Sequence, residues 1–315
     1  MYRIGVDLGG TNITAGIIDS ENKIIGRGSV KTHAGRVAEE IFADIAKTIG
    51  LALDDAKVDI SECKSIGIGT PGSVNKEIGE IVYANNLGFH HVMGRALLNQ
   101  YYDIPVYFDN DANCAALGEA VAGAGCGKKS FVAVTLGTGV GSGVIIDGKI
   151  VTGCNDAAGE CGHMVIVVDG EDCTCGRKGC WEAYASATAL IRQTKAAMLE
   201  DKDSAMWELV GGDINLVSGR TSFDGMRAND PTAKKVVDQY IKYVSVGTVN
   251  LINALQPEVV CFGGGICNER DTLLNPIREY VARERYSRYA DVQTEICRAV
   301  LGNDAGIIGA ALLDE

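Results

Sequence analysis

Proline and positive charge are both scarce in this sequence. Its 315 residues include 5 prolines, and 29 lysines and arginines face 41 aspartates and glutamates, for a net charge of −12. An acidic surface repels nucleic-acid backbones and anionic lipids, so we expect neither nucleic acid nor membrane as a partner. No apolar run is long enough to span a bilayer. Residues 1–7 also lack the layout of a signal peptide. These absences predict a cytoplasmic protein whose 11 cysteines are mostly reduced thiols.

Glycine and apolar residues are abundant instead, with 40 glycines and a hydrophobic fraction of 46%. This composition can fill the cores of two domains joined by tight turns. Apolar patterning predicts strands at 2–8, 13–18, 23–25, 65–69, 106–108, 130–136, 140–146, 149–151 and 258–262. Helices are expected at 112–122, 182–199, 231–255 and 305–313, and around the four-residue spacing of Val37, Ile41, Ile45 and Ile49. Strands interleaved with helices indicate an α/β fold.

Two segments of the sequence have the same pattern of predicted strands and turns. Residues 2–25 and 130–151 each contain a strand, a Gly/Thr turn, a strand ending Ile-Ile-Asp, a second turn and a strand beginning with Lys-Ile. This similarity indicates an internal duplication, or else two unrelated hairpins that share common turn residues. We expect a smaller N-terminal domain at 1–120 and a larger one at 121–302. The last helix, about 303–315, is expected to return to the first domain.

Three predicted strands end in small-residue turns that could bind phosphate. They are Gly9-Gly10-Thr11-Asn12, Gly137-Thr138-Gly139 and Gly263-Gly264-Gly265. Glycine lets backbone N–H groups approach phosphate oxygens, and none of the three fits a P-loop or a dinucleotide-binding fingerprint. Each alone could be a structural turn; together, at strand ends in two similar halves, they favour a phosphate-binding site.

Acidic side chains stand beside two of the predicted strand ends. Asp7 precedes the first glycine turn and could cap that turn or bind the magnesium that accompanies a polyphosphate. The run Asp109-Asn110-Asp111-Ala112-Asn113 follows a strand and opens a helix. One such residue would serve as an N-cap, but four polar residues in five exceed that need. We therefore predict Asp111 as a general base for a substrate hydroxyl, with Asn110 hydrogen-bonded to the substrate.

A cluster of metal-binding residue types lies in the middle of the chain. Cys173, Cys175 and Cys180 fall within eight residues, and His163 lies ten residues before the first of them. A His/Cys3 set suits tetrahedral zinc, and four protein ligands predict a structural metal rather than a catalyst. Glu160 and Glu182 flank the cluster; they are predicted sugar contacts, or else solvated acids or partners of the metal ligands.

These features, in this order, resemble the ROK family of bacterial sugar kinases and repressors, and the match looks closest to its glucokinases. The resemblance covers nearly the whole chain. It rests on Asp7 to Asn12, Gly69-Thr70-Pro71-Gly72, Asn110 to Asn113, Gly137 to Gly143, Gly159 to His163, and the CxCGxxGCxE run ending at Glu182. It implies a two-domain actin- and hexokinase-like (ribonuclease H-like) fold with an interdomain cleft.

The resemblance also implies a site and a reaction. ATP, with Mg²⁺, would lie across the three glycine turns, and Asp111 would deprotonate the 6-hydroxyl of glucose or a related hexose. Structural Zn²⁺ would be bound by His163, Cys173, Cys175 and Cys180. Family members commonly form homodimers. The sugar would be held by Gly72, Asn86, Asn110, Asp111, Glu160, His163 and Glu182.

The sequence departs from the family pattern at two places. Asn12 stands where many members have lysine. Because Asn85 and Asn86 are adjacent, either of them could correspond to the family's sugar-contacting asparagine. Alternative functions within the family are an N-acetylmannosamine kinase, a fructokinase and a non-catalytic sugar sensor. A DNA-binding repressor is not expected, because the first strand begins at Tyr2, which leaves no place for a preceding helix-turn-helix domain.

Overall fold

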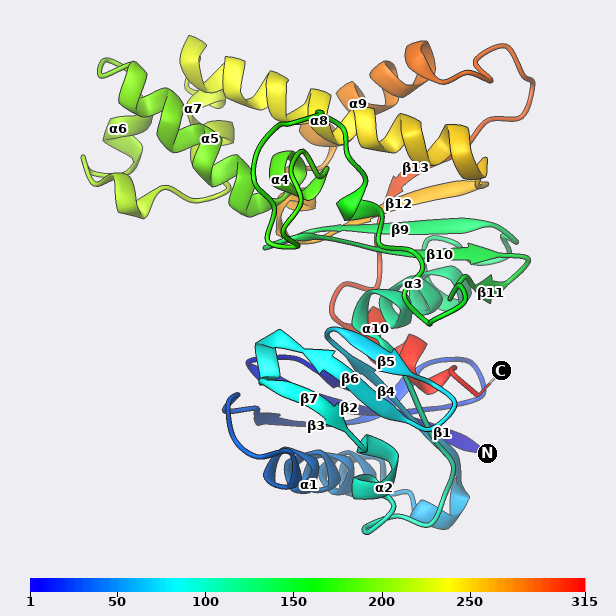
Figure 1. The fold of residues 1–315 in the computed structure, drawn as a ribbon. Coiled ribbons are helices and arrows are strands. Elements are labelled where there is room, and N and C mark those ends of the chain that lie inside the picture. Colours follow the sequence, from blue (N-terminus) through cyan, green and yellow to red (C-terminus); the bar gives the residue numbers. More distant parts are fainter. Residues whose placement is uncertain (315) are drawn as a thin grey trace. The chain divides into compact units, whose positions relative to one another are not determined.

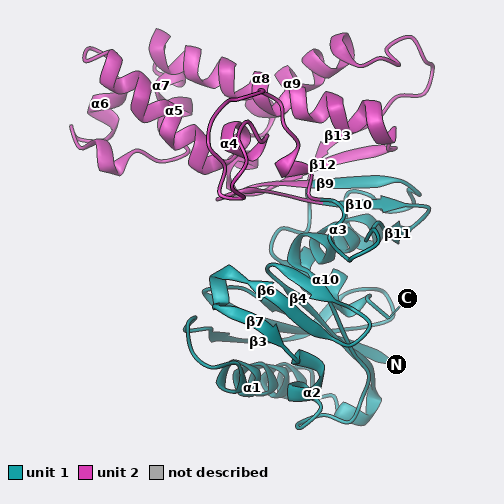
Figure 2. Cartoon of the chain, viewed as in Figure 1, with its two compact units in different colours: residues 1–133, 143–159, 299–315 teal, residues 134–142, 160–298 magenta. Residues whose placement is uncertain are grey.

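The computed structural model describes residues 1–314, which form two compact units (Figure 2). One unit contains residues 1–133 and 143–159 and the described chain from residue 299 onward; the other contains residues 134–142 and 160–298. None of the helices in this part of the chain is long and apolar enough to cross a membrane.

Figure 1 shows the strands and helices along the chain. The strands are β1 (Tyr2–Leu8), β2 (Asn12–Ile18), β3 (Ile24–Lys31), β4 (Cys63–Thr70), β5 (Ser73–Asn75), β6 (Glu80–Ala84), β7 (Phe89–Val92), β8 (Val106–Asn110), β9 (Phe131–Leu136), β10 (Val140–Ile146), β11 (Lys149–Ile150), β12 (Val259–Gly263) and β13 (Glu295–Arg298). The helices are α1 (Ala38–Ala56), α2 (Gly94–Leu98), α3 (Asp111–Ala122), α4 (Glu182–Ala185), α5 (Ala187–Glu200), α6 (Met206–Leu209), α7 (Thr221–Arg227), α8 (Pro231–Leu255), α9 (Asp271–Glu284) and α10 (Asp304–Ala311). Short 3-10 helices occur at Ile60–Glu62, Asn85–Leu87, Cys161–His163, Ile214–Leu216 and Gly265–Glu269.

The first unit is built on a mixed five-stranded sheet of order β3-β2-β1-β4-β8. Strands β1, β2 and β3 are antiparallel neighbours, whereas β4 and β8 join β1 in parallel. Helix α1 packs on β2 and β3, and α10 packs on β1 and β4. The approach of α10 requires glycine: a Cβ on Gly5 or Gly67 would lie within 2 Å of an α10 carbonyl oxygen. The C-terminal helix therefore packs directly on the sheet backbone.

The second five-stranded sheet repeats this order. Its order is β11-β10-β9-β12-β13. As in the first sheet, three consecutive strands form a meander, and the first strand of the meander (β9) also pairs with a later strand (β12), which is followed by β13 at the edge. The turn between β10 and β11 uses Asp147 and Gly148, both with positive φ, as expected of a tight hairpin. Because the two sheets share their whole strand order, the similarity of residues 2–25 and 130–151 reflects a duplicated topology rather than common turn chemistry alone.

Capping residues set the ends of the longest helix. The Asp230 side chain accepts hydrogen bonds from the amides of Thr232 and Ala233, and Pro231 occupies the first turn of α8. The helix ends at Leu255, before Gln256 in the left-handed conformation. Both bounds confirm the sequence prediction. The start is predictable because aspartate as N-cap and proline in the first turn are local signals.

The predicted helix at 182–199 is wrong in one respect, since two helices occupy this segment. Ser186 takes an extended conformation between α4 and α5, and its hydroxyl accepts a hydrogen bond from the amide of Ala189. An N-cap serine in the middle of an apolar, alanine-rich run therefore restarts the helix. The break directs α4 toward the metal cluster described below.

Trp181 centres the packing of α4 against α8. Its side chain is fully buried, and its indole N–H donates to the carbonyl of Tyr243 at 2.9 Å. A Cβ on Gly247 of α8 would lie 2.1 Å from the indole ring, so glycine at this position makes room for it. The residue next to Cys180 is thus fixed by the core of the second unit.

Candidate functional site

Parallel pairing brings the predicted acidic residues to one edge of the first sheet. In register, Asp7 of β1 lies beside Gly69 of β4, and Gly69 lies beside Asp109 of β8. The carboxyl ends of adjacent parallel strands are a common place for ligand sites in α/β proteins. Asp7 and the Asp109–Asn113 run, predicted separately from the sequence, therefore belong to one region of the first unit.

Asp109 is fully buried and heavily hydrogen-bonded. It accepts from the Asn113 amide side chain at 2.9 Å and from the Asn110 backbone amide at 2.7 Å, and it pairs with the ammonium group of Lys76. A buried carboxylate needs such compensation. The Asp109–Lys76 pair joins the end of β8 to the residue that follows β5. Lys76 was missed by the sequence analysis, since 33 residues separate it from its partner.

Asn110 is the N-cap of α3. One residue of this run thus has the capping role that the sequence analysis considered beside substrate binding. Its side-chain oxygen accepts from the amides of Ala112 and Asn113 at 2.8 and 3.4 Å. Its amide nitrogen donates to the carbonyl of Gly72 at 2.9 Å. Gly72 has φ +87°, and a Cβ there would lie 1.9 Å from the Tyr83 carbonyl oxygen, so only glycine fits.

Asp111 is the exposed first residue of α3. One of its carboxylate oxygens accepts a hydrogen bond from the amide of Ala112 at 2.8 Å, which fixes the side chain at the helix N-terminus. Burial, and secondarily the charge of Asp111, raise the pKa of Asp7 to about 6. Capping by Asn110 and burial of Asp109 thus leave Asp111 as the carboxylate of this run that a ligand can reach.

The turn from Gly9 to Asn12 closes through a hydrogen bond from the Gly9 amide to the Asn12 carbonyl, at 3.0 Å. Thr32 at the end of β3 fastens it from the side: its hydroxyl donates to the Gly9 carbonyl at 2.6 Å and its amide to the Thr11 carbonyl at 3.0 Å. A pocket of about 500 Å³ adjoins the turn. Its lining consists of Asp7, Gly9, Gly10, Thr11, Asn12, Thr14, Arg27, Asn303, Asp304 and Ile307.

Of the two asparagines at 85 and 86, Asn86 is the one beside this turn. A Cβ on Gly10 would lie 3.5 Å from the Cβ of Asn86. The side chain of Asn85 is instead engaged by the hydroxyl of Tyr83, at 3.1 Å. The geometry therefore favours Asn86 as the side chain available to a ligand in the first unit.

The second glycine turn, Gly137 to Gly139, is held by the start of α5 and by Glu182. The Gly137 carbonyl accepts from the amide of Ala187, and the Thr138 carbonyl accepts from the hydroxyl of Thr188, each at 2.8 Å. A carboxylate oxygen of Glu182 accepts from the Val140 amide at 2.9 Å. A Cβ on Gly139 would meet this carboxylate at 2.2 Å, so the turn and the acid need a glycine between them.

The third glycine run lies next to the second. Gly264 has φ +94°, and a Cβ there would lie 2.3 Å from the carbonyl oxygen of Leu136, the residue before Gly137. Gly263 ends β12, and Gly265 begins a 3-10 helix. Two of the three predicted phosphate turns are thus packed together within the second unit.

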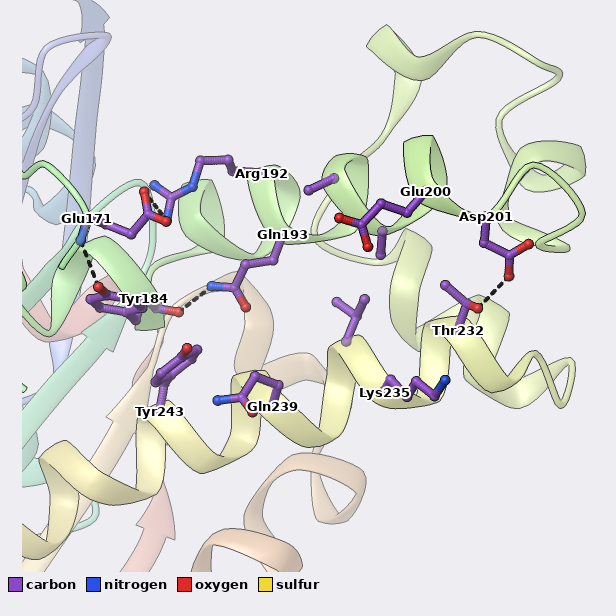
Figure 3. A pocket seen from close by; sticks show the side chains of 13 residues that line it. Glu171, Tyr184, Arg192, Gln193, Glu200, Asp201, Thr232, Lys235, Gln239 and Tyr243 are labelled. Carbon is purple, nitrogen blue, oxygen red and sulfur yellow. Dashed lines mark hydrogen bonds and ion pairs between the residues drawn. The ribbon is translucent and has the colours of Figure 1, made fainter. Parts of the chain in front are cut away.

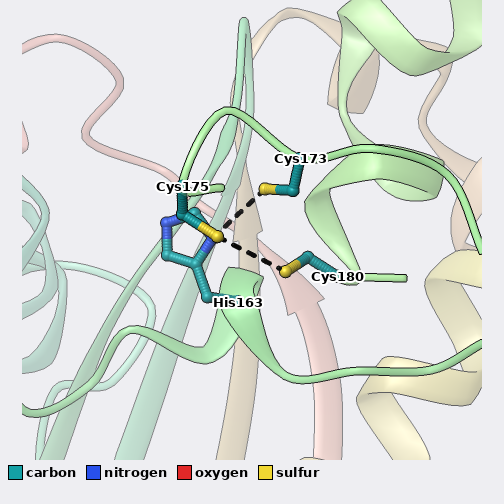
Figure 4. Close-up of side chains that lie close together, drawn as sticks. All are labelled: His163, Cys173, Cys175 and Cys180. Carbon is teal, nitrogen blue, oxygen red and sulfur yellow. Dashed lines mark hydrogen bonds between the residues drawn. The ribbon is translucent and has the colours of Figure 1, made fainter. Parts of the chain in front are cut away.

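The four predicted metal ligands come together in the second unit (Figure 4). The ligand atoms of His163, Cys173, Cys175 and Cys180 all lie within 4.8 Å of one another. The sulfurs of Cys175 and Cys180 are 3.7 Å apart, and His163 Nδ1 is 3.5 Å from the Cys173 sulfur. Tetrahedral zinc, with bonds of about 2.3 Å to sulfur and about 2.0 Å to nitrogen, requires separations of about 3.8 and 3.5 Å. The donor set therefore fits zinc.

Glu182 connects this cluster to the second glycine turn. While one carboxylate oxygen accepts from Val140, the other accepts from the Thr174 hydroxyl at 3.3 Å and lies 3.7 Å from the Cys173 sulfur. Both oxygens thus have partners within the protein, which is the arrangement of a residue that supports the metal loop. Glu160 is exposed, and its backbone carbonyl accepts from the amide of His163.

Replacing Cys175 with serine tests the metal cluster. The variant should lose most of its zinc, measured by atomic emission on the purified protein, because an alkoxide is a much weaker zinc ligand than a thiolate. The matched control is Cys126→Ser, which removes an exposed thiol outside the cluster. We expect about one zinc per chain in the wild type and the control. Equal zinc in all three proteins would contradict the assignment.

A second concavity of about 770 Å³ lies between α5 and α8 (Figure 3). Some of its polar side chains interact with one another: Glu171 pairs with Arg192, and Asp201 accepts from the hydroxyl of Thr232. None of the residues predicted to bind substrate, nucleotide or metal lines it. The groove therefore contributes nothing to the candidate site.

Comparison with known proteins identifies the family. The model of the ROK family matches residues 3–315, so the chain belongs to the ROK family. It is 36% identical to a glucokinase of Halalkalibacterium halodurans over 99% of this chain and 94% of the relative. It is 28% identical to a xylose repressor of Bacillus subtilis, covering 98% of this chain and 75% of the repressor.

Comparison of structures gives the same family and confirms the predicted fold class. A ROK family glucokinase from Streptomyces griseus, solved in complex with glucose and AMPPNP, matches with a TM-score of 0.82 at 33% identity, over 99% of both chains. The two α/β units are therefore those of the actin- and hexokinase-like fold.

Proposed function

We propose that this protein is a hexose kinase that transfers the γ-phosphoryl group of ATP to the 6-hydroxyl of glucose. The observation that carries the proposal is the placement of Asp111: an exposed carboxylate at the carboxyl end of β8, near Asp7 and held at a helix N-terminus. The similarity to glucokinases over nearly the whole chain supports glucose as the sugar.

Asp111 acts as general base in this proposal. Its carboxylate accepts the proton of the sugar 6-hydroxyl while the hydroxyl oxygen forms a bond to the γ-phosphorus. The bond from that phosphorus to the β–γ bridging oxygen breaks, and ADP leaves with the electron pair. Asp111 then releases its proton to water. Asn110, whose side chain is fixed by Gly72 and the first turn of α3, would orient the sugar.

Asp7 is suited to magnesium. Its carboxylate is largely buried, and no basic side chain of residues 1–314 forms an ion pair with it. A hard oxygen donor without a cationic partner is the group that Mg²⁺ binds, directly or through water. Magnesium would neutralise phosphate charge as the transferred group leaves ADP.

The remaining predicted contacts complete the proposal. Zinc would be structural, because His163 and three cysteines already provide four ligands. We further propose that the protein is a cytoplasmic homodimer. Light scattering would measure the mass of the dimer. Backbone amides of the glycine turns, with Thr11 and Thr138, would bind the nucleotide phosphates. The remaining sugar contacts would be Gly72, Asn86, Glu160, His163 and Glu182.

A sugar panel tests the proposed function. ADP release coupled to NADH oxidation should show the highest kcat/KM for glucose, compared with N-acetylmannosamine and fructose at equal MgATP. A higher kcat/KM for either competitor would reassign the substrate within the same reaction type. If none of the three sugars stimulated ADP release, the kinase proposal would fail, and a sugar-binding regulator would remain as the function.

A further inference from the structure

The glycine turn at the first sheet has no positive charge of its own. Gly9, Gly10, Thr11 and Asn12 are uncharged, and the pocket beside them contains the carboxylates of Asp7 and Asp304. A nucleotide carries three to four negative charges on its phosphates, and charged donors bind phosphate roughly twice as strongly as neutral ones. Apart from the Mg²⁺ proposed at Asp7, any positive charge for a phosphate at this turn would come from a side chain outside the turn.

Arg27 lines the pocket but is already committed. Its guanidinium makes two parallel hydrogen bonds to the carboxylate of Asp304, each 2.7 Å long. Such a bidentate pair is the most favourable geometry for arginine and carboxylate, so Arg27 and Asp304 neutralise each other at this wall of the pocket. Arg27 is therefore not the side chain that would balance a phosphate charge here.

Strand register brings Lys31 to the face of the sheet on which this pocket lies. In the antiparallel pair of β2 and β3, Lys31 lies directly opposite Asn12, and Ser29 lies opposite Thr14. Directly opposed residues share a face of the sheet, with Cβ atoms about 5 Å apart. The hydroxyls of Thr14 and Ser29, 3.4 Å apart, show that these rows do share a face. Asn12 and Thr14 line the pocket, so the side chain of Lys31 belongs to the pocket's face of the sheet.

The backbone that carries Lys31 is fixed to the turn itself. The next residue, Thr32, is fully buried and makes both hydrogen bonds that fasten the turn. The guanidinium of Arg36 in turn donates to the Thr32 carbonyl at 2.7 Å and to Asp44 of α1 at 2.5 Å. Lys31 itself is exposed, and no carboxylate of residues 1–314 pairs with it. The lysine is thus rigidly anchored at Cα and uncommitted at its ammonium group.

We propose that Lys31 binds the phosphate chain of the nucleotide at the Gly9–Asn12 turn, an assignment that rests on the proposed function in requiring a nucleotide. The positive charge would then come from Lys31 on strand β3, directly opposite the uncharged Asn12 on β2. Because the ammonium group contacts phosphate and not the base or the sugar, its removal should weaken nucleotide binding while leaving the KM for hexose unchanged.

Calorimetric titration of the full-length protein with MgATP, without sugar, tests this assignment. Lys31→Gln should raise the Kd for MgATP about tenfold, the loss typical of one charge-assisted contact to phosphate. The Kd for adenosine, which has no phosphate, should not change. The matched control is Lys23→Gln, which changes an exposed lysine of the β2–β3 turn that pairs with Glu21. This variant should bind MgATP as the wild type does.

A charge relocation provides the second arm. The double variant Asn12→Lys, Lys31→Gln moves the ammonium group to the opposed position of the same pair and should recover most of the lost MgATP affinity. Wild-type affinity in Lys31→Gln, or an equal loss for adenosine and MgATP, would overturn the assignment, as would a wild-type protein that does not bind MgATP. If MgATP binding depends on Lys31 but no sugar is phosphorylated, the kinase proposal fails and this one stands.

Discussion

The Asp111→Asn variant is expected to lose about 10²–10⁴-fold in kcat, the contribution typical of a general base. The amide has the same shape and keeps an oxygen that can accept from the Ala112 amide, so the helix start should be preserved. It cannot take up a proton from the sugar hydroxyl. Steady-state kinetics should therefore show a reduced kcat with little change in the KM values for sugar and MgATP.

Asp103→Asn is the matched control for this substitution. Asp103 is an exposed aspartate of the same unit, seven residues before the β8 terminus at Asn110. The control should retain wild-type kinetics. Circular dichroism should show both variants folded, with at most about 1 kcal/mol lost in Asp111→Asn from the missing charge at the helix N-terminus. A kcat within threefold of wild type in the Asp111 variant would rule out base catalysis by this residue.

Asp7→Asn is expected to make the protein more stable and nearly inactive. Burial and the Asp111 charge raise the pKa of Asp7 from 3.8 to about 6, so the ionised carboxylate is held in the fold at a cost. This displacement corresponds to on the order of 3 kcal/mol above pH 6, since each pKa unit is worth about 1.4 kcal/mol. The neutral amide avoids the cost but is a poor magnesium ligand, so activity should fall by at least about a hundredfold.

The sign of the pH dependence follows from the raised pKa. Below about pH 3 the carboxyl group is protonated in both the folded and the unfolded protein, so the wild type and its asparagine variant should be equally stable there. As pH rises from about 4 to 6, Asp7 ionises in the unfolded chain while it stays largely protonated in the folded protein, so the wild type loses stability relative to the variant over this range and the difference is constant above it. Urea unfolding at about pH 3 and at about pH 7 measures the stability difference under both conditions.

Kinetics provide an independent measurement of the same group. The kcat/KM for MgATP should rise between pH 5 and 7 with a midpoint near the Asp7 pKa of about 6. In Asp111→Asn the neighbouring charge is gone, so an NMR titration should find the Asp7 pKa lower than in the wild type. A wild-type stability equal to that of Asp7→Asn at pH 7, or an Asp7 pKa unmoved in Asp111→Asn, would contradict the proposed coupling.

The elements that the sequence predicted well are those whose signals are local. Helix α8 begins at the Asp230-Pro231 pair and ends before Gln256, and the apolar spacing of Ile41, Ile45 and Ile49 is the buried face of α1. The short strands β5, β6 and β7 were not predicted, because three to five residues carry too little periodicity to register. The break at Ser186 was also not predicted, because the apolar, alanine-rich residues on both sides of this N-cap are typical of one continuous helix.

The candidate site divides along the same line. Residue types at short spacing predicted the His163 and cysteine cluster and the Asp109–Asn113 run, and the structure brings each set together. Long-range partners were not predictable. Lys76 meets Asp109 only because β5 and β8 lie in one unit, and Lys31 faces Asn12 only through the register of β2 and β3. Pairing between strands depends on the whole sheet, which local patterns do not specify.

The buried indole next to Cys180 makes the metal loop optically visible. Trp181 is fully enclosed and hydrogen-bonded to α8, whereas Trp207, the other tryptophan, is partly exposed with a lysine ammonium over its ring. An enclosed indole fluoresces at shorter wavelength than a hydrated one, so Trp207→Phe would leave tryptophan emission from Trp181 alone. Chelator titrations of that single-tryptophan protein can then test whether metal removal changes the packing of the residue next to Cys180 against α8.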